Sequence, residues 1–152
     1  MDVRIGDFED PRVVDLLREH LAGMHASSPP GQVFALDLSG LQHPLVSFYT
    51  VWDGDDLLGC GAIKHVDRET AELKSMRTTA RHLRRGAARF MLDHLLMLAR
   101  ARRYKRVCLE TGSGAAFEPA LALYRKAGFS ACDAFGGYTA SEFNQFLALA
   151  LD

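Results

Sequence analysis

Residues 72–92 read Glu-Leu-Lys-Ser-Met-Arg-Thr-Thr-Ala-Arg-His-Leu-Arg-Arg-Gly-Ala-Ala-Arg-Phe-Met-Leu. The first part alternates apolar and polar residues, as a strand does, and the last part has the period of an amphipathic helix. A basic turn containing Gly86 joins them. The first turn of a helix attracts anions, because its backbone N–H groups are unpaired and the peptide dipoles align there. We therefore expect this turn to bind a phosphorylated ligand beside Arg84, Arg85 and Arg89.

The charge of this turn supports the same interpretation. A cation at the start of a helix opposes the helix dipole, at a cost of about 0.3 to 1 kcal/mol each. Three arginines there hinder folding unless an anion completes the site. The net charge of the whole chain is only −1, so the basic turn is a local feature and a general attraction to nucleic acid is not expected.

Length and composition indicate a single folded domain over residues 1–152. A chain of this size buries roughly two thirds of the surface that its unfolded form exposes. Hydrophobic residues make up 48% and charged residues 24%, which is ordinary for a globular protein. No secretory signal is evident, and no segment reaches the roughly 18 apolar residues of a bilayer span. The prediction is a cytoplasmic protein with no membrane partner.

The cysteines point to the same compartment. Cys60, Cys108 and Cys132 are odd in number and widely spaced. This pattern is typical of reduced thiols and fits neither a disulfide framework nor a zinc site. We expect no bound metal.

Hydrophobic periodicity predicts a mixed α/β fold. Helices are expected from Pro11 to Met24 after an Asp10 cap, from Gly86 onward, and from Glu118 to a stop at Gly128. His20, near the apolar face of the first helix, is predicted to be packed or exposed rather than catalytic. Strands are expected at 3–5, 48–52, 57–66, 70–78, 106–110, 131–132 and 144–151.

These elements predict a mostly antiparallel sheet of about six to seven strands with helices on both faces. Residues 70–78 and 106–110 should form its one parallel pair, through a right-handed crossover. Residues 26–44 are expected to be a long loop around a short helical piece, either a substrate-binding rim or a plain connection.

Two motifs and the strand between them carry a resemblance to a known family. Leu83-Arg84-Arg85-Gly86-Ala87-Ala88 fits a turn of the form Gln/Arg-x-x-Gly-x-Gly/Ala, and Leu123-Tyr124-Arg125-Lys126-Ala127-Gly128-Phe129 fits a helix end of the form Leu-Tyr-x-x-x-Gly-Phe. The strand Val107–Glu110 lies between them. In this order they resemble the GCN5-related N-acetyltransferase (GNAT) superfamily, in an uncharacterised bacterial branch. Leu83 departs from the usual Gln or Arg, and Arg84 replaces a frequent glycine.

The resemblance implies a GNAT-like fold whose parallel strands splay apart around acetyl-CoA, the expected co-substrate. Its pyrophosphate would bind the N–H groups of the basic turn, and its pantetheine arm would pair with the strand at Met76 and Thr78. The implied coenzyme-binding residues are Met76, Arg77, Thr78, Leu83, Arg84, Arg85, Gly86, Ala87, Ala88, Arg89, Thr111 and Tyr124.

The implied reaction is acetyl transfer to a primary amine. The nitrogen must be neutral to attack, and deprotonating a lysine-like amine at pH 7 costs about 4 to 5 kcal/mol. Glu72 is the leading candidate for the base, acting through water, and Glu110 is the runner-up; both carboxylates could also be merely structural. Tyr124 is implied to protonate the departing thiolate, and the N–H of Met76 to stabilise the oxyanion. No cysteine sits where a covalent relay needs one, so direct transfer in a ternary complex is expected.

The acceptor is predicted to be a small amine, such as an amino acid or a metabolite. Arg77 or Lys64 could bind a carboxylate on it. Other residues that could shape its pocket are Phe48, Tyr49, Trp52, His65 and Tyr138.

Two rival functions stay open: a module that senses acyl-CoA without catalysis, and a nucleotide- or nucleic-acid-binding domain. The second lacks the glycine-rich loops of nucleotide-binding folds. Either a monomer or a homodimer is compatible with the sequence.

Overall fold

The computed structural model describes residues 1–152. The strands are β1 Asp2–Ile5, β2 Val46–Asp53, β3 Asp56–His65, β4 Thr70–Thr78, β5 Arg106–Thr111, β6 Ser130–Ala131 and β7 Gln145–Ala150. The helices are α1 Pro11–Ser27, α2 Leu38–Leu41, α3 Ala87–Ala101 and α4 Glu118–Lys126, with single 3₁₀ turns at Ala80–His82 and Ala115–Phe117. The predicted order is confirmed, and only element ends shift. No helix is both long and apolar enough to cross a bilayer.

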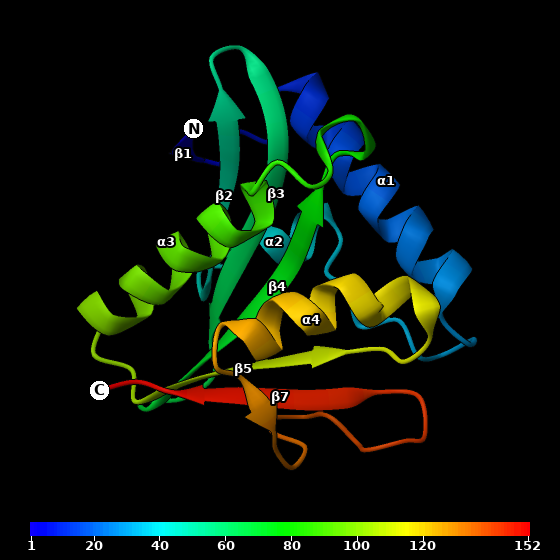
Figure 1. Ribbon diagram of the computed structural model, residues 1–152, viewed down its shortest axis with the longest axis vertical. Coiled ribbons are helices and arrows are strands. Elements are labelled where there is room, and N and C mark those ends of the chain that lie inside the picture. The colour runs from blue at the N-terminus through cyan, green and yellow to red at the C-terminus, as the bar shows by residue number, and fades with distance from the viewer.

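The seven strands form one sheet in the order β1-β2-β3-β4-β5-β7-β6, and every neighbouring pair is antiparallel except β4 with β5. Helices α3 and α4 lie on one face, and α1 and α2 on the other (Figure 1). The predicted mixed sheet, its single parallel pair and the helices on both faces are thus confirmed.

Two apolar clusters hold these layers together. Leu92 and Leu95 of α3 and Leu121 of α4 are fully buried in the larger one. Val13 and Leu17 of α1 pack in the smaller one. The start of α1 is as predicted, since the Asp10 side chain accepts a bond from the Arg12 N–H and Pro11 is the first helical residue. The sheet is therefore held from both sides near its centre.

The parallel pair separates after three residues. Thr70, Ala71 and Glu72 of β4 pair with β5, and beyond Glu72 the strands have no partners in each other. Figure 1 shows that β4 and β5 lie side by side at one end and diverge toward the other. A β-bulge lies just beyond it, because Lys74 faces Ala62 whereas Arg77 faces Cys60, and Ser75 has a φ of 56°. Such a bulge bends its strand and increases the local twist, which carries β4 away from β5.

The turn between β4 and α3 contains two residues of left-handed conformation. Gly86 has a φ of 85° and Arg84 a φ of 63°. Only glycine adopts this region without a penalty, since a Cβ atom crowds the following carbonyl oxygen. Arg84 is therefore held in a conformation that glycine would adopt more easily.

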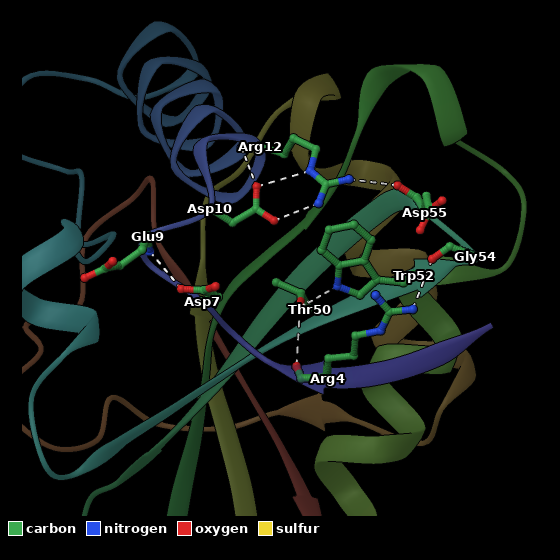
Figure 2. A network of polar contacts seen from close by, with 9 residues as sticks. All are labelled: Arg4, Asp7, Glu9, Asp10, Arg12, Thr50, Trp52, Gly54 and Asp55. Carbon is green, nitrogen blue, oxygen red and sulfur yellow. Dashed lines mark hydrogen bonds and ion pairs between the residues drawn. The ribbon is translucent and has the colours of Figure 1, made fainter.

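Trp52 ties the far end of the sheet to α1. Figure 2 shows its indole ring between the guanidinium groups of Arg4 and Arg12, whose Cζ atoms lie 4.8 and 4.6 Å from the ring centroid. Arg4 Nη2 donates to the Gly54 carbonyl and Arg12 Nη1 to the Asp55 carbonyl, each at 3.0 Å. β1, α1 and the β2–β3 turn thus meet at one side chain, and Trp52 belongs to the core rather than to an acceptor pocket.

We expect Trp52→Phe to lower the free energy of unfolding by about 1 to 3 kcal/mol, because the smaller ring loses buried contact area and the 2.8 Å bond from Nε1 to Thr50 Oγ1. Urea unfolding followed by circular dichroism measures this, since Trp52 is the only tryptophan. Phe90→Leu, at a side chain that is 39% exposed, should change the value by less than about 0.5 kcal/mol. Equal losses in the two variants would contradict the stabilising role of this contact.

Two substitutions in the turn before α3 should differ in their effect on the free energy of unfolding. Gly86→Ala should destabilise the fold by about 1 to 2 kcal/mol, because alanine is strained at this φ although only one atom lies as near as 4.0 Å. Arg84→Gly should be neutral within about 0.5 kcal/mol, since relief of strain offsets the added freedom of the unfolded chain. Thermal and denaturant unfolding of both variants provide the check, and a harmless Gly86→Ala would refute the strained geometry.

Candidate active site

A cavity of about 230 Å³ occupies the gap where β4 and β5 separate. Its wall comes from α1, the loop after it, both strands, the 3₁₀ turn Ala115–Phe117 and α4. The wall residues are His20, Gly23, Met24, Ser27, Phe34, Ala35, Leu73, Lys74, Ser75, Met76, Arg77, Leu109, Glu110, Thr111, Ala116, Phe117, Ala120 and Tyr124. Four predicted site residues, Met76, Arg77, Thr111 and Tyr124, lie on this wall. Ser27, Phe34 and Ala35 belong to the segment predicted as a possible substrate rim.

The predicted phosphate-binding turn lies next to the cavity wall along the chain but is not part of it. Thr78 ends β4, and Gly86 is the residue before α3, whose first turn has no side-chain cap and no acidic residue. Ala87 is buried and Ala88 half-buried, while the Leu83 side chain is 59% exposed. No side chain of the protein therefore accepts a hydrogen bond from the backbone N–H groups at the start of α3.

The arginines of this turn are less isolated than expected. Arg85 pairs with Asp53 at 3.1 Å and Arg89 with Asp93 at 2.9 Å, and only Arg84 has no acidic partner. The expectation that all three charges hinder folding is wrong for Arg85 and Arg89, because a neighbouring strand end and the next helical turn supply carboxylates. Both pairs are largely exposed, and exposed pairs are worth only about 0 to 1 kcal/mol.

Tyr124 lies on the cavity wall at the end of α4. The residue is 6% exposed, and its ring contacts Phe129, with ring centroids 5.7 Å apart. Burial raises the pKa of the Tyr124 phenol above its usual range, so the hydroxyl is protonated at neutral pH. The side chain thus packs in the core and also presents a proton donor to the cavity.

Glu72 is held away from the cavity by other side chains. Its Oε2 accepts bonds from the Tyr138 hydroxyl at 2.5 Å and from Lys74 Nζ at 3.2 Å, and only 3% of the residue is exposed. It is not part of the cavity wall. This position disfavours the predicted role of Glu72 as the base, because its carboxylate already serves a buried ion pair.

Glu110, the alternative base, does lie on the cavity wall, at the end of β5. It is half-buried, and no group of the chain donates a hydrogen bond to its carboxyl oxygens. Burial raises the pKa of Glu110 to about 7, opposed by the nearby charge of Lys74 and reinforced by that of Glu72. A carboxylate with a pKa near neutrality can both accept and release a proton.

His20 and Arg77 form a second polar unit on the wall. Arg77 Nε donates to His20 Nδ1 at 3.0 Å, and Arg77 Nη2 donates to the His20 carbonyl at 3.1 Å. Burial, with a contribution from the Arg77 charge, lowers the pKa of His20 to about 4, so this ring is neutral. Since Nδ1 accepts, the ring proton is on Nε2. Of the two predicted alternatives for His20, packed or exposed, the structure shows the packed one, and the sequence did not indicate its place on the cavity wall.

Sequence patterns did not identify several residues of the cavity wall, for different reasons. His20 and Gly23 carry no signal, because a helix pattern does not reveal which sheet residue faces it. For Lys74 the sequence did hold a signal. Glu72 and Lys74 alternate with Ala71 and Leu73 along β4, so their side chains lie on the same face of the sheet, opposite to that of Ala71 and Leu73.

The other residues considered for an acceptor pocket lie elsewhere. Phe48 packs in the core beneath α1 and α2, Tyr49 contacts His94, and His65 Nδ1 is 2.6 Å from the Tyr104 hydroxyl. Tyr138 alone approaches the cavity, through an edge contact with Phe34 at 5.4 Å.

No cysteine lies on the cavity wall. All three cysteines are free thiols, as predicted. Burial raises the pKa of Cys60 to about 12 and that of Cys108 to about 11, so neither is a thiolate at neutral pH.

Comparison with known proteins agrees with this geometry. The chain is 46% identical to the uncharacterized N-acetyltransferase YsnE of Bacillus subtilis strain 168 over 138 residues, which is 91% of each protein. Among solved structures, a candidate acyl-CoA N-acyltransferase from Klebsiella pneumoniae has a TM-score of 0.82 at 24% identity, covering 99% of this chain and 97% of that one. A GNAT family acetyltransferase from Elizabethkingia anophelis, solved with acetyl-CoA bound, has a TM-score of 0.72 at 18% identity, covering 99% and 97%.

The family comparison covers most of the molecule. Residues 12–129 match the acetyltransferase (GNAT) family, a range that includes both motifs, the separating strands and every residue of the cavity wall. The chain therefore belongs to the GNAT acetyltransferase family.

Proposed function

We propose that this protein transfers an acetyl group from acetyl-CoA to a primary amine of a small molecule, directly within a ternary complex. The observation that carries the proposal is the cavity between the separating strands, because it brings a protonated phenol, Tyr124, and a carboxyl group of near-neutral pKa, Glu110, to one space. The composition and the reduced cysteines support a cytoplasmic enzyme, acting as a monomer or a homodimer without nucleic acid.

The residues present fit the coenzyme. The start of α3 offers N–H groups without side-chain caps, and Ala87 and Ala88 leave its backbone accessible. Arg85 and Arg89 can exchange weak surface pairs for phosphate oxygens. Beyond Glu72, the edge of β4 that faces β5 is free for an extended pantetheine chain. When bound there, acetyl-CoA supplies an activated thioester.

The proton transfers can be assigned to two side chains. Glu110 takes a proton from the ammonium group of the acceptor, which frees the nitrogen lone pair for attack on the thioester carbonyl carbon. As the carbon–sulfur bond breaks, Tyr124 gives its proton to the departing sulfur. The acylated nitrogen gives its second proton to the Tyr124 phenolate, directly or through water, which restores the phenol and leaves a neutral amide and a free thiol. Glu110 returns the first proton to solvent. Direct transfer is supported because no cysteine lines the cavity.

The substitution Tyr124→Phe should lower the rate of catalysis and leave acetyl-CoA binding unchanged. We expect calorimetry to detect acetyl-CoA binding to the wild type and to this variant alike, while kcat on an amine panel falls about 100-fold or more, as for loss of a general acid. Tyr49→Phe, which removes a phenol outside the cavity, should retain kcat.

Each other outcome has a distinct meaning. Absence of binding to the well-folded wild type would overturn the whole proposal. Binding without turnover of any amine, polyamine or lysine peptide would instead support an acyl-CoA-sensing module. Unchanged turnover in Tyr124→Phe would remove Tyr124 from the mechanism.

The pH dependence of kcat tests the base. In the wild type we expect kcat to rise with pH through about 7, because Glu110 must be ionised to accept the proton. Glu110→Gln should lower kcat about 100-fold and abolish this limb of the profile. Glu118→Gln, at an exposed position outside the cavity wall, should keep the wild-type profile. If kcat of Glu110→Gln still rises with pH through about 7, a group other than Glu110 is responsible for the pH dependence.

A further inference from the structure

Three cations lie on the α1-side face of β3 and β4. Lys64 faces Glu72, Ala62 faces Lys74 and Cys60 faces Arg77, and residues directly opposite each other share a face of the sheet. Lys64 is not on the cavity wall. Lys74 is on it, but its ammonium group is already bonded to the Glu72 carboxylate and the Tyr138 hydroxyl. Arg77 alone both lines the cavity and takes part in no ion pair of the structure.

Helix α1 fixes the Arg77 guanidinium without neutralising it. The two acceptors that it meets there, the Nδ1 atom and the carbonyl oxygen of His20, are uncharged. Gly23 provides the space, since a Cβ atom at this position would lie 2.5 Å from Arg77 Nη2. The remaining nitrogen, Nη1, makes no hydrogen bond within the chain. A planar guanidinium held in this way is suited to a carboxylate.

A carboxyl group lies on the other wall of the same cavity. Glu110 comes from β5, the strand that separates from the one carrying Arg77, and its carboxyl oxygens receive no hydrogen bond from the chain. The cavity therefore presents a cation without an acidic partner and a carboxyl group without a donor. A molecule that carries both an ammonium and a carboxylate group matches this pair. The volume of about 230 Å³ is below the roughly 300 to 1,000 Å³ of pockets for drug-sized ligands, which favours a small acceptor.

We infer that the acceptor is an amino acid or a close analogue, whose carboxylate binds the Arg77 guanidinium while its amino group meets Glu110. This inference rests on the proposed N-acetyltransferase function and names the substrate class. It selects Arg77 over Lys64, the other cation considered for this role. The backbone of Arg77 keeps its predicted place beside the coenzyme, and its side chain serves the acceptor.

Matched substrates test the inference. Coenzyme A release from acetyl-CoA is measured with the common amino acids, each compared with the amine that lacks its carboxylate and with its amide. For the acceptor that reacts best, we expect kcat/KM to be at least about 10-fold higher than for the matched amine, which corresponds to about 1.4 kcal/mol. In Arg77→Met this preference should disappear, with a raised KM for the amino acid and an unchanged KM for acetyl-CoA.

A second variant keeps the arginine and moves it. Gly23→Ala should displace the guanidinium at little cost to the fold, because the contacted atom is the end of a flexible side chain. Its KM for the amino acid should rise as in Arg77→Met, and it carries the test should Arg77→Met fail to fold. Lys64→Met removes a cation from the same face outside the cavity and should leave both KM values unchanged.

The outcomes separate this inference from the proposed function. Faster turnover of amines without a carboxylate, or a carboxylate preference that survives Arg77→Met, would overturn the inference and leave the N-acetyltransferase intact. A rise in the KM for acetyl-CoA alone would assign the anion at Arg77 to the coenzyme, and the inference would fail. No turnover with any amine, polyamine or lysine peptide would overturn the proposed function itself.

Discussion

The separation of β4 from β5 is the constraint on which the rest of this molecule depends. Parallel strands in one sheet normally satisfy each other's backbone groups, yet here the pairing ends at Glu72 although both strands continue. The cause is the bulge around Ser75, a non-glycine residue held in a left-handed conformation. Backbone groups facing such a gap need new partners, from water or from a ligand. Local strain in one strand thus creates the space in which the chemistry is proposed to occur.

Two acidic residues on either side of this gap have different surroundings and therefore different roles. Glu72 precedes the bulge and is buried, and there Lys74 and Tyr138 satisfy its carboxylate. Glu110 lies on the facing strand beyond the last paired residue, where it meets the cavity without a donor, and burial raises its pKa toward neutrality. The Glu72 carboxylate is therefore occupied by hydrogen bonds within the chain, whereas the Glu110 carboxyl is buried and left open to a ligand in the cavity.

Helix α1 contributes to the site from the other face of the sheet. His20 and Gly23 set the position of Arg77, so the placement of the helix controls a side chain of β4. The helix is held in turn at its first residues, where Arg12 packs on Trp52 and bonds to the β2–β3 turn (Figure 2). A contact far along the helix from the cavity thereby supports the geometry of the cavity, through the stiffness of a helix of 17 residues.

By itself the sequence determined the elements, the parallel pair, the glycine turn before α3 and the place of Tyr124 on α4. These features depend on local periodicity and on turn residues, which neighbouring positions along the chain encode. Only the tertiary structure decided which acid meets the cavity and which cation there lacks a partner. A bulge changes the direction in which the later side chains of its strand point. Tyr138, which bonds to Glu72, and His20, which bonds to Arg77, come from segments distant in sequence, so no local pattern could assign these contacts.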